Sequence, residues 1–418
     1  MNDTLEPSSV RERNLSQVLK LIHERGSISR ASMVREIGLS ATAISSIVAE
    51  LLDSGYISEG GAGKSSGGRR PILVEFNSDH RWVVGIDLGA SHISTILSNL
   101  SGEVKAKKYK KFNVANDPKG ALEVVHSQIS GSLSENKKNL RGILGIGLAI
   151  PAPLEGEKLD TFSPVILPRW KDIKVAAILE RAFGIPVYMD NDANAGALAE
   201  KWWGRGRGVT NMVYIKLGTG VGSGLIIQDD IFRGSGGTAG EIGHTTIDIN
   251  GHQCRCGNFG CMESFVGIPA ILEKTAERIS KNSSSSLDPD HIDIDSITKA
   301  ALEQDPIACE IVREAGRDLG IAIANSINLI NPELIVLGGE LVEAGDVFME
   351  AVCASAFSRS ISKAVNEVTI TSSTFYEDVV SVGAATLVMY NAFMPPNIRS
   401  TLSMKKEVVI SDSLSYDG

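Results

Sequence analysis

The segment at residues 241–263 reads EIGHTTIDINGHQCRCGNFGCME, and it constrains the fold of this chain more than any other stretch. It holds three of the chain's five cysteines within eight residues: Cys254, Cys256 and Cys261. Zinc prefers thiolate and imidazole ligands in sets of four, and histidines lie just upstream of these cysteines. The pattern therefore predicts one structural zinc ion, bound by three cysteines and one histidine, that ties this loop down.

Two histidines could complete the ligand set. His244 lies ten positions before Cys254 and His252 lies two positions before it, so spacing alone does not choose between them. The alternative to a metal site is that the thiols stay reduced and pack as small apolar groups. Three clustered thiols rarely serve only as packing, which favours the metal.

Size and charge limit the class of protein. The chain has 418 residues, of which 43% are hydrophobic, enough for two or three domains with large cores. It begins without an apolar signal segment and has no run near the roughly 18 apolar residues of a membrane span, so we expect a cytoplasmic protein without membrane insertion. A net charge of -9 argues against a protein that coats nucleic acid but allows a small DNA-reading domain on an acidic body.

The first 80 residues predict three helices. Apolar residues recur at helical spacing over residues 14–25, and a second short helix is expected at 30–37. Gly38 then supplies a turn, and Ser40 is a suitable N-cap for a third helix with one apolar face. The opposite face has small residues that would let the helix approach DNA base edges closely. These residues are Thr42, Ser45, Ser46 and Ala49.

Two short strands are predicted after the third helix, at 56–59 and 72–76. The segment GGAGKSSGGRRP between them is typical of a flexible hairpin tip. Its charges, Lys64, Arg69 and Arg70, could meet DNA phosphates or enter a minor groove. Three helices followed by such a hairpin predict a winged helix-turn-helix. Segments with this pattern also serve as protein-contact modules, which is the alternative to DNA binding.

The rest of the chain alternates predicted strands and helices, which indicates an α/β architecture. Buried strands are expected at 83–87, 143–150 and 212–217, and glycine-rich turns follow the first and third of these. A further glycine turn follows the strand in INPELIVLGGEL. Such turns let backbone amides surround an anion, so together they predict a nucleotide cleft between two related lobes. The residues concerned are Asp87, Gly89, Ser91, Gly218, Thr219, Gly220, Gly338 and Gly339.

The segment YMDNDANAGALAEKWWGRG lies between the first two glycine turns. A strand is expected to end at Asn191 and Asp192, and a helix is predicted over 193–203. Asp192 could act as a general base toward a sugar hydroxyl, or it could only cap the helix. Oriented hydrogen bonds to other hydroxyls could come from Asn191, Glu241, His244 and Glu263.

These motifs together resemble the ROK family (repressors, open reading frames and kinases). The resemblance rests on the winged helix followed by DLGAS, DNDANAGALAE, GTGVGSG, EIGH, CRCGNFGCME and INPELIVLGGEL, and it spans roughly residues 15–390. It implies an actin-like ATPase fold of two α/β lobes, and members with the N-terminal extension are sugar-responsive repressors. It also implies sugar contacts from Asn191, Asp192, Glu241, His244 and Glu263. Finally, it implies zinc ligation by His244, not His252, with Cys254, Cys256 and Cys261.

The chain departs from the kinase members of this family in two places. Kinases usually carry Asp-x-Gly-Gly-Thr-Lys where this chain has DLGASH, and the methyl group of Ala90 could crowd a phosphate. Kinases also commonly place a sugar-binding asparagine in the segment that here reads SPVILPRW and includes Val165. Asp192, the catalytic base of the kinase members, and the second glycine turn are intact. ATP binding and residual phosphotransfer are therefore compatible with the sequence.

We therefore expect a repressor that binds operator DNA through residues 1–80 and a sugar or sugar phosphate between two lobes. The lobes are expected at 81–200 and 201–380, with a helix near 380–394 rejoining the first lobe and a partly disordered tail at 395–418. A single recognition helix gives limited specificity, so we expect a homodimer or higher homo-oligomer. The alternatives are an ATP-dependent sugar kinase with an added DNA-binding domain and a repressor controlled by a protein partner.

Overall fold

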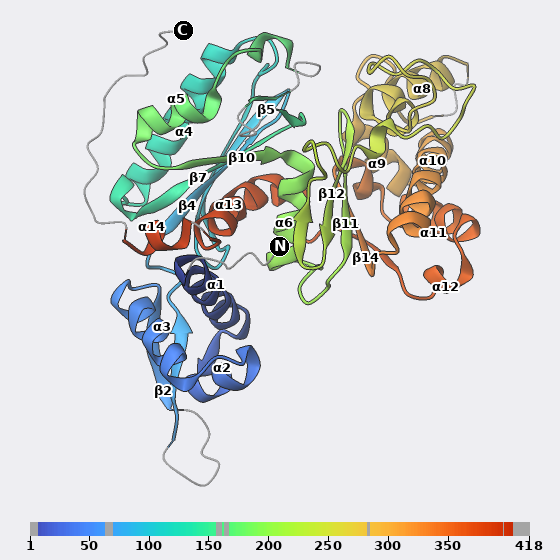
Figure 1. Cartoon of the computed structure of the whole chain (residues 1–418). Coiled ribbons are helices and arrows are strands. Elements are labelled where there is room, and N and C mark those ends of the chain that lie inside the picture. Colours follow the sequence, from blue (N-terminus) through green and yellow to red (C-terminus); the bar gives the residue numbers. More distant parts are fainter. Residues whose placement is uncertain are drawn as a thin grey trace.

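The computed structural model describes residues 7–62, 70–155, 161–162, 167–281, 285–395 and 397–403. Lys64 and Arg69 of the predicted wing and Val165 of the predicted departure from the kinases lie outside the described residues. The described part contains a small N-terminal unit and two larger lobes, each built on a five-stranded sheet (Figure 1).

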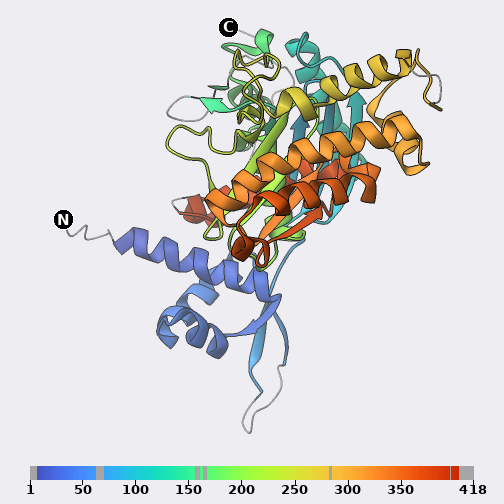
Figure 2. The same cartoon turned by 90° about the vertical axis from the view of Figure 1, so that its right-hand side faces the viewer.

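The N-terminal unit consists of three helices and a three-stranded antiparallel sheet in the order β1-β3-β2. Gly38, at a φ of +79°, ends the second helix, and the Ser40 hydroxyl caps the third by accepting a hydrogen bond from the amide of Ala43. Figure 2 shows this unit below the lobes, with its first helix nearest to them. Its elements are α1 (Pro7–Arg25), β1 (Ser27–Ser29), α2 (Arg30–Ile37), α3 (Ala41–Asp53), β2 (Ile57–Ala62) and β3 (Ile72–Phe76).

Helix α1 begins at Pro7, earlier than the start predicted at residue 14. The prediction followed apolar periodicity, which residues 7–13 lack because most of them are polar. This part of the helix is held by a contact with another helix, since Arg11 forms a 2.6 Å ion pair with Glu50 of α3.

The first lobe has a sheet in the order β10-β7-β4-β5-β6, with helices on both faces. Alternation along β4 turns Val84 and Ile86 toward the core under α4 and α5, and turns Val83 toward α13. Helix α13 lies close to β7, because a Cβ atom added at Gly147 would meet the carbonyl oxygen of Ala384 at 1.7 Å. The strands are β4 (Trp82–Leu88), β5 (His92–Asn99), β6 (Val104–Lys111), β7 (Ile143–Ile150) and β10 (Val187–Asn191); the helices are α4 (Pro118–Glu135), α5 (Val175–Phe183) and α13 (Val379–Ala392). A short hairpin, β8 (Leu154–Glu155) and β9 (Thr161–Phe162), follows β7.

The second lobe has a sheet in the order β13-β12-β11-β14-β15. Helix α6 (Asp192–Trp203) contacts α13, β11 and β12 and so lies between the two lobes. The strands are β11 (Met212–Leu217), β12 (Val221–Ile227), β13 (Asp230–Phe232), β14 (Leu334–Gly338) and β15 (Thr369–Ser372). The helices are α7 (Glu263–Val266), α8 (Ile268–Lys281), α9 (Ile294–Leu302), α10 (Pro306–Ile330), α11 (Asp346–Arg359) and α12 (Ser362–Val365).

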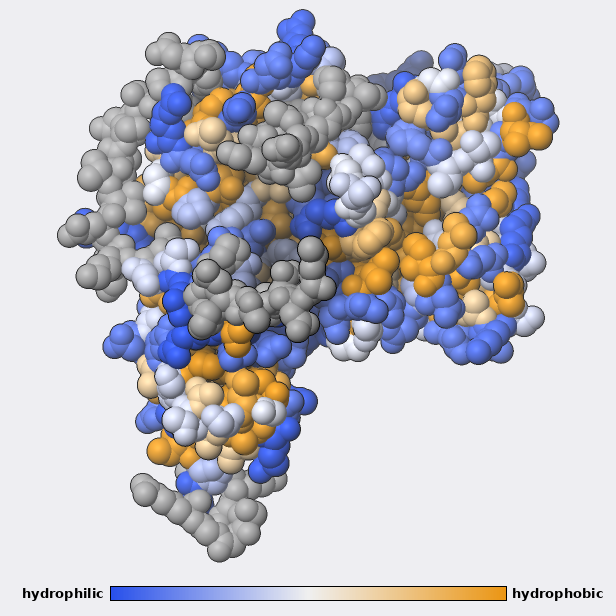
Figure 3. Space-filling model, viewed as in Figure 1, coloured by the Kyte–Doolittle hydropathy of each residue, from blue (hydrophilic) through white to orange (hydrophobic). Residues whose placement is uncertain are grey.

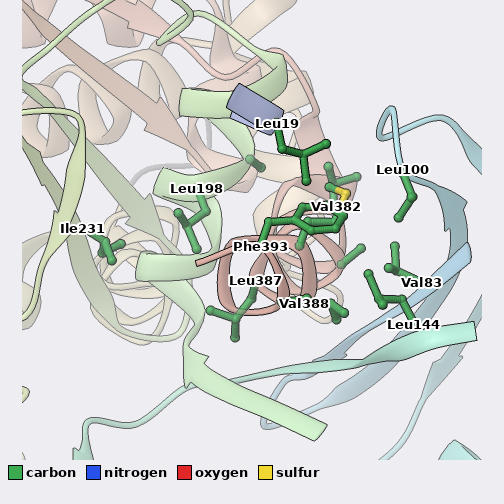
Figure 4. Close-up of a cluster of buried hydrophobic side chains, with 14 of the residues drawn as sticks. Leu19, Val83, Leu100, Leu144, Leu198, Ile231, Val382, Leu387, Val388 and Phe393 are labelled. Carbon is green, nitrogen blue, oxygen red and sulfur yellow. The ribbon is translucent and has the colours of Figure 1, made fainter. Parts of the chain in front are cut away.

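One hydrophobic core runs from the N-terminal unit into the first lobe. Figure 4 shows Leu19 of α1 beside Val382, which belongs to α13, and beside Phe393, which directly follows α13. Rings make the rest of the joint: His23 of α1 lies 5.5 Å from Trp202 and 5.1 Å from Trp203, measured between ring centroids. The two bodies are therefore joined by packing as well as by the chain.

Part of the segment predicted as a partly disordered tail is helical in the described chain. Residues Asn397–Ser403 form helix α14, which contacts α1. Ile398 and Thr401 are buried, and Arg399 lies 3.8 Å from Glu12 of α1. Weak periodicity concealed a helix that depends on these contacts. The short strand expected at 408–410 lies outside the described residues.

No single helix in the described ranges is long and apolar enough to cross a membrane. The segments Tyr376–Ala392 and Asn397–Ser403 reach that length only together, and they are bent by 95°. Most residues of α13 are buried in the protein core. On the face drawn in Figure 3, hydrophilic and hydrophobic residues are interspersed.

Candidate functional site

The predicted acid lies at the centre of a charged network between the lobes. Asp192 opens α6 and is 7% exposed, and its carboxylate forms an ion pair with the ammonium group of Lys216 on β11. Side chains alternate along β11, so Lys216 shares the face of Met212 and Tyr214, which is turned to α6. Burial acts to lower the pKa of Lys216, but the charges of Asp192 and Asp87 outweigh it and raise that pKa. Lys216 is therefore a permanent cation between the lobes.

Asp87 and His92 form the second part of this network. Asp87, at the end of β4, is 4% exposed, and its Oδ2 lies 3.0 Å from Nε2 of His92. Burial favours neutral forms of both groups, but their mutual hydrogen bond lowers the pKa of Asp87 and raises that of His92. The other carboxylate oxygen of Asp87 is buried without a hydrogen-bond partner among the described residues. Gly89 permits this arrangement, since an added Cβ atom would meet the His92 ring at 2.4 Å.

The start of α6 is capped by Asn191, so the prediction that Asp192 might only cap the helix is wrong. Oδ1 of Asn191 accepts a 2.9 Å hydrogen bond from the amide of Ala193. Both residue types are good caps, and the extended backbone at Asn191 places its side chain, not that of Asp192, over the free amides. The preceding residue, Asp190, is 1% exposed and binds Arg233 of the second lobe at 2.6 Å.

Two backbone amides of the second glycine turn make hydrogen bonds within the protein. The amide of Gly218 donates to the carbonyl of Gly220, and the amide of Val221 donates to Glu263 at 3.0 Å. Arg255 pairs with both oxygens of Glu263 at 2.8 Å and covers Gly220. Glu263 thus braces the turn in the described structure, and two of its amides already have partners. Thr219, at the tip, is exposed.

The third glycine turn serves close packing of the strands. Gly339 has a φ of +109°, and an added Cβ atom would meet the carbonyl of Leu217 at 1.7 Å. A Cβ atom at Gly338 would meet the Tyr214 hydroxyl at 2.2 Å. These glycines therefore let the end of β14 approach β11. Ser91, in the first turn, uses its carbonyl to accept from the amide of Phe112.

The predicted metal ligands form one cluster. The ligand atoms of His244, Cys254, Cys256 and Cys261 all lie within 4.8 Å of one another. Nδ1 of His244 is 3.7 Å from Sγ of Cys254, and the Sγ atoms of Cys256 and Cys261 are 3.6 Å apart. A tetrahedral zinc ion with bonds of about 2.3 Å separates its sulfur ligands by about 3.8 Å. The donor set fits such an ion, and it includes His244, not His252.

The metal cluster adjoins Glu241 through His244. The second ring nitrogen of His244, Nε2, lies 3.9 Å from a carboxylate oxygen of Glu241. Burial raises the pKa of Glu241, and the charges of Asp192 and Glu263 act in the same direction. The charge of His244 acts to lower this pKa but does not outweigh them. The carboxylates predicted to hold hydroxyls therefore lie within electrostatic reach of one another.

The predicted DNA-reading face of α3 is exposed. Thr42, Ser45, Ser46 and Ala49 are all exposed, whereas Ile44 is fully buried. Arg11 of α1 lies 3.4 Å from the Ser46 hydroxyl, which adds a cation beside this face. Of the three predicted wing charges, Arg70 is described, and it is exposed.

Comparison with known proteins identifies the family to which this chain belongs. The sequence profile described as the ROK family matches residues 83–391. The chain belongs to the ROK family. A second profile, described as winged helix-turn-helix DNA-binding, matches residues 11–58 ahead of the ROK domain. The predicted fold class, a winged helix followed by a two-lobed ROK fold, is therefore confirmed.

Relatives include both regulators and kinases. A xylose repressor of Caldicellulosiruptor bescii is 36% identical over 337 residues, covering 80% of this chain and 84% of the relative. The crystal structure of a ROK family transcriptional regulator, a homologue of the E. coli Mlc protein, matches with a TM-score of 0.80 at 27% identity, over 94% of this chain and all of that one. A ROK family glucokinase from Streptomyces griseus shares the fold of the ROK domain, with a TM-score of 0.66 at 24% identity, over 74% of this chain and 99% of the kinase.

Sequence reasoning missed several charged residues of this ROK domain. Lys216, Arg233 and Arg255 each neutralise a carboxylate that the fold buries. Lys216 did leave a signal, because it is a lone charge in the apolar strand MVYIKL. The partners of Arg233 and Arg255 could not be inferred before the lobes and the cysteine loop were placed.

Proposed function

We propose that this protein is a sugar-responsive transcriptional repressor, in which the winged helix binds operator DNA and a sugar or sugar phosphate binds between the ROK lobes. The observation that carries the proposal is the shared core between the winged helix and the lobe that presents Asp192. A ligand that prefers one arrangement of the lobes can then change DNA affinity, whereas equal affinity for both arrangements would change nothing. The similarity to a xylose repressor supports the same function.

The proposed sugar contacts are side chains around the start of α6 and the metal cluster. Asp192 would accept a hydrogen bond from one hydroxyl while Lys216 donates to a neighbouring oxygen. Glu241 and His244, which face each other at 3.9 Å, would hold further hydroxyls. Asn191 and Glu263 complete the proposed set, although both also make the internal hydrogen bonds described above.

The proposed DNA contacts divide into two kinds. Thr42, Ser45 and Ser46 would meet base edges, because they are exposed on the helix that follows the turn. Lys64, Arg69 and Arg70 would meet phosphates. Two such heads in a homodimer would address two half-sites, which is why we propose a dimer or a higher symmetric oligomer.

We also propose that the cysteine cluster holds one zinc ion per chain. The ion would cross-link the loop that carries Arg255 and Glu263, and so fix the second glycine turn. Metal analysis should give about one zinc per chain, and Cys256→Ser should lose both the zinc and the sugar response. Cys353→Ser, outside the cluster, is the matched control. Full zinc content in Cys256→Ser would contradict the ligand set.

The domain boundaries that we propose are a DNA-binding unit at residues 1–80, lobes at 81–200 and 201–380, and a tail at 395–418. Contacts of α13 with β4 and β7 support its return to the first lobe. Limited proteolysis would test these limits.

The function is tested with the full-length protein and DNA sites that it selects from a random pool. Thermal shift with D-xylose, N-acetyl-D-glucosamine, D-glucose and their phosphates identifies the effector, because binding to the native state raises stability. The identified sugar should then change operator affinity at least tenfold in fluorescence anisotropy. A protein that selects no DNA site, or whose DNA affinity ignores every bound sugar, would contradict the proposal.

The kinase alternative is favoured by the likeness of the ROK domain to a glucokinase. The ion pair of Asp192 with Lys216 argues against it, because Lys216 occupies a carboxylate oxygen that would have to accept the proton of the sugar hydroxyl. We expect little or no turnover with ATP and the same sugars. Turnover of several per second that Asp192→Asn abolishes would move the kinase to first place.

A further inference from the structure

The charged network around Lys216 is rich in carboxylates. Two buried carboxylates, Asp87 and Asp192, and the exposed Glu340 all act on this one ammonium group. His92 is the other basic group at the site, and its Nε2 lies 3.0 Å from Oδ2 of Asp87. Buried carboxylates need a compensating cation, so we expect a cation between Asp87 and Asp192.

The geometry of Asp87 gives a second, independent indication. Its Oδ2 is bound by His92, but its Oδ1 is buried and has no hydrogen-bond partner among the described residues. Lys216 makes its direct contact with Asp192 and reaches Asp87 only through its charge. The ammonium group of Lys216 thus compensates the charge of Asp87 without forming a hydrogen bond to its Oδ1. Carboxylate oxygens are the ligands that hard divalent ions prefer.

The ammonium comes from a different lobe than the carboxylates. Asp87 lies near the end of β4 and Asp192 follows β10, and both strands belong to the first sheet, whereas Lys216 belongs to β11 of the second. We propose that Lys216 is a specificity-determining residue: its ammonium group occupies a divalent-cation position in the cleft and keeps metal ions out. The cleft is thereby restricted to ligands that arrive without a metal ion, which deepens the proposed sensor function and rests on it.

The proposal predicts that removing the charge creates a metal site. Lys216→Thr removes both charge and stem, Lys216→Met keeps most of the stem, and Lys216→Arg keeps the charge and is the matched control. Full-length zinc-loaded protein is titrated with Mn²⁺, and bound ion is measured by electron paramagnetic resonance with Mg²⁺ as competitor. We expect Lys216→Thr and Lys216→Met to bind one Mn²⁺ per chain at least tenfold more tightly than the parent and Lys216→Arg. Adding Asp87→Asn to either variant should remove that ion.

The outcomes separate this inference from the proposed function. A parent protein that binds Mn²⁺ within twofold of Lys216→Thr and Lys216→Met would overturn the inference, as would folded variants that bind none. If Lys216→Thr does not fold, Lys216→Met decides the question, with its thermal transition as the check. The measurement needs no sugar, so a parent chain that binds no sugar would refute the proposed sensor without affecting the metal result.

Discussion

The two ends of α6 are held in opposite ways. At its first residue, Asp192 is paired with Lys216 in a network of charges. At its last turn, Trp202 and Trp203 pack against the ring of His23 from the winged helix. Charged and hydrogen-bonded groups can exchange partners with an incoming ligand, whereas a packed aromatic joint has no group to exchange. One end of the helix is therefore suited to receive a ligand, and the other is suited to report it.

The length of α6 sets the scale of this connection. Its twelve residues span about 18 Å, from Asp192 to the joint. A tilt at the Asp192 end would carry the tryptophans with it, because interiors packed at crystal-like density transmit strain. The following predictions test whether the two ends have separate roles.

The largest effect is expected from Trp203→Ala at the packed end. Trp203 touches His23 and donates a 2.8 Å hydrogen bond to Thr386 of α13, so removing its side chain should lower the free energy of unfolding by about 3 kcal/mol. Operator affinity should fall at least tenfold, while sugar affinity stays within twofold. Leu179→Ala in α5 is the control, because Leu179 is fully buried in a different core cluster from the joint. A fall in sugar affinity in Trp203→Ala would erase the distinction between the ends.

Acid should weaken the same joint through His23. Burial and the charge of Arg207 lower the pKa of His23 from 6.5 to about 4, and a hydrogen bond to the backbone of Leu100 opposes them only in part. The unfolded chain then binds this proton below about pH 6.5 and the folded chain only below about pH 4, so stability falls as the pH drops between these values. We expect a decrease of about 2 kcal/mol, allowing for partial exposure, in urea unfolding at a series of pH values. His23→Phe keeps a ring without titrating, and an unchanged pH slope in that variant would assign the effect elsewhere.

Asp192→Asn changes the charged end alone. It keeps the size of the side chain but removes its charge, so affinity for the sugar should change by roughly 1.5 kcal/mol, or about tenfold, in calorimetry. Operator binding without sugar should stay within twofold of the parent. Asp346→Asn, at an exposed position on α11, is the control for a general effect of charge. An unliganded Asp192→Asn protein that binds DNA poorly would show that Asp192 also holds the resting arrangement of the lobes.

The smallest effect is expected at the wing. Replacing Arg69 and Arg70 by alanine should weaken operator binding and lower the slope of log affinity against log salt by about one unit for each phosphate that the protein no longer neutralises. Ser45→Ala should instead alter sequence preference more than affinity. Sugar affinity should be the same in all of these proteins, and an unchanged salt slope would mean that these arginines do not meet the backbone of DNA.

Local signals were enough to predict much of the fold. The limits of α2, β3, β7 and β11 follow from apolar patterns bounded by glycine, proline or a capping serine, and Gly38 and Ser40 have the predicted roles. The start of α1 and the presence of α14 could not be predicted this way. Both depend on contacts between distant segments, such as Arg11 with Glu50 and Arg399 with Glu12.

The candidate site was predictable in its residue types but not in its pairings. The cysteine cluster follows from spacing, since its ligands lie close together along the chain. The choice of Asn191 over Asp192 as the helix cap depends on the backbone angle at one residue. The partners Lys216 and Arg255 depend on how the lobes and the loop close. Assigning sugar contacts to Asn191, Asp192, Glu241, His244 and Glu263 stays a prediction.

The continuous core beneath the winged helix limits how such a regulator can be recombined. Trp202 and Phe393 belong to the large body, yet their cover is supplied by Leu19, His23 and Phe76 of the head. An unrelated head grafted at the chain junction would leave those rings bare, and the chimera would tend to aggregate. Exchanging only the exposed face of α3 leaves the cover in place. This protein can therefore acquire a new DNA sequence specificity more readily by substitutions on α3 than by exchange of its whole DNA-binding domain.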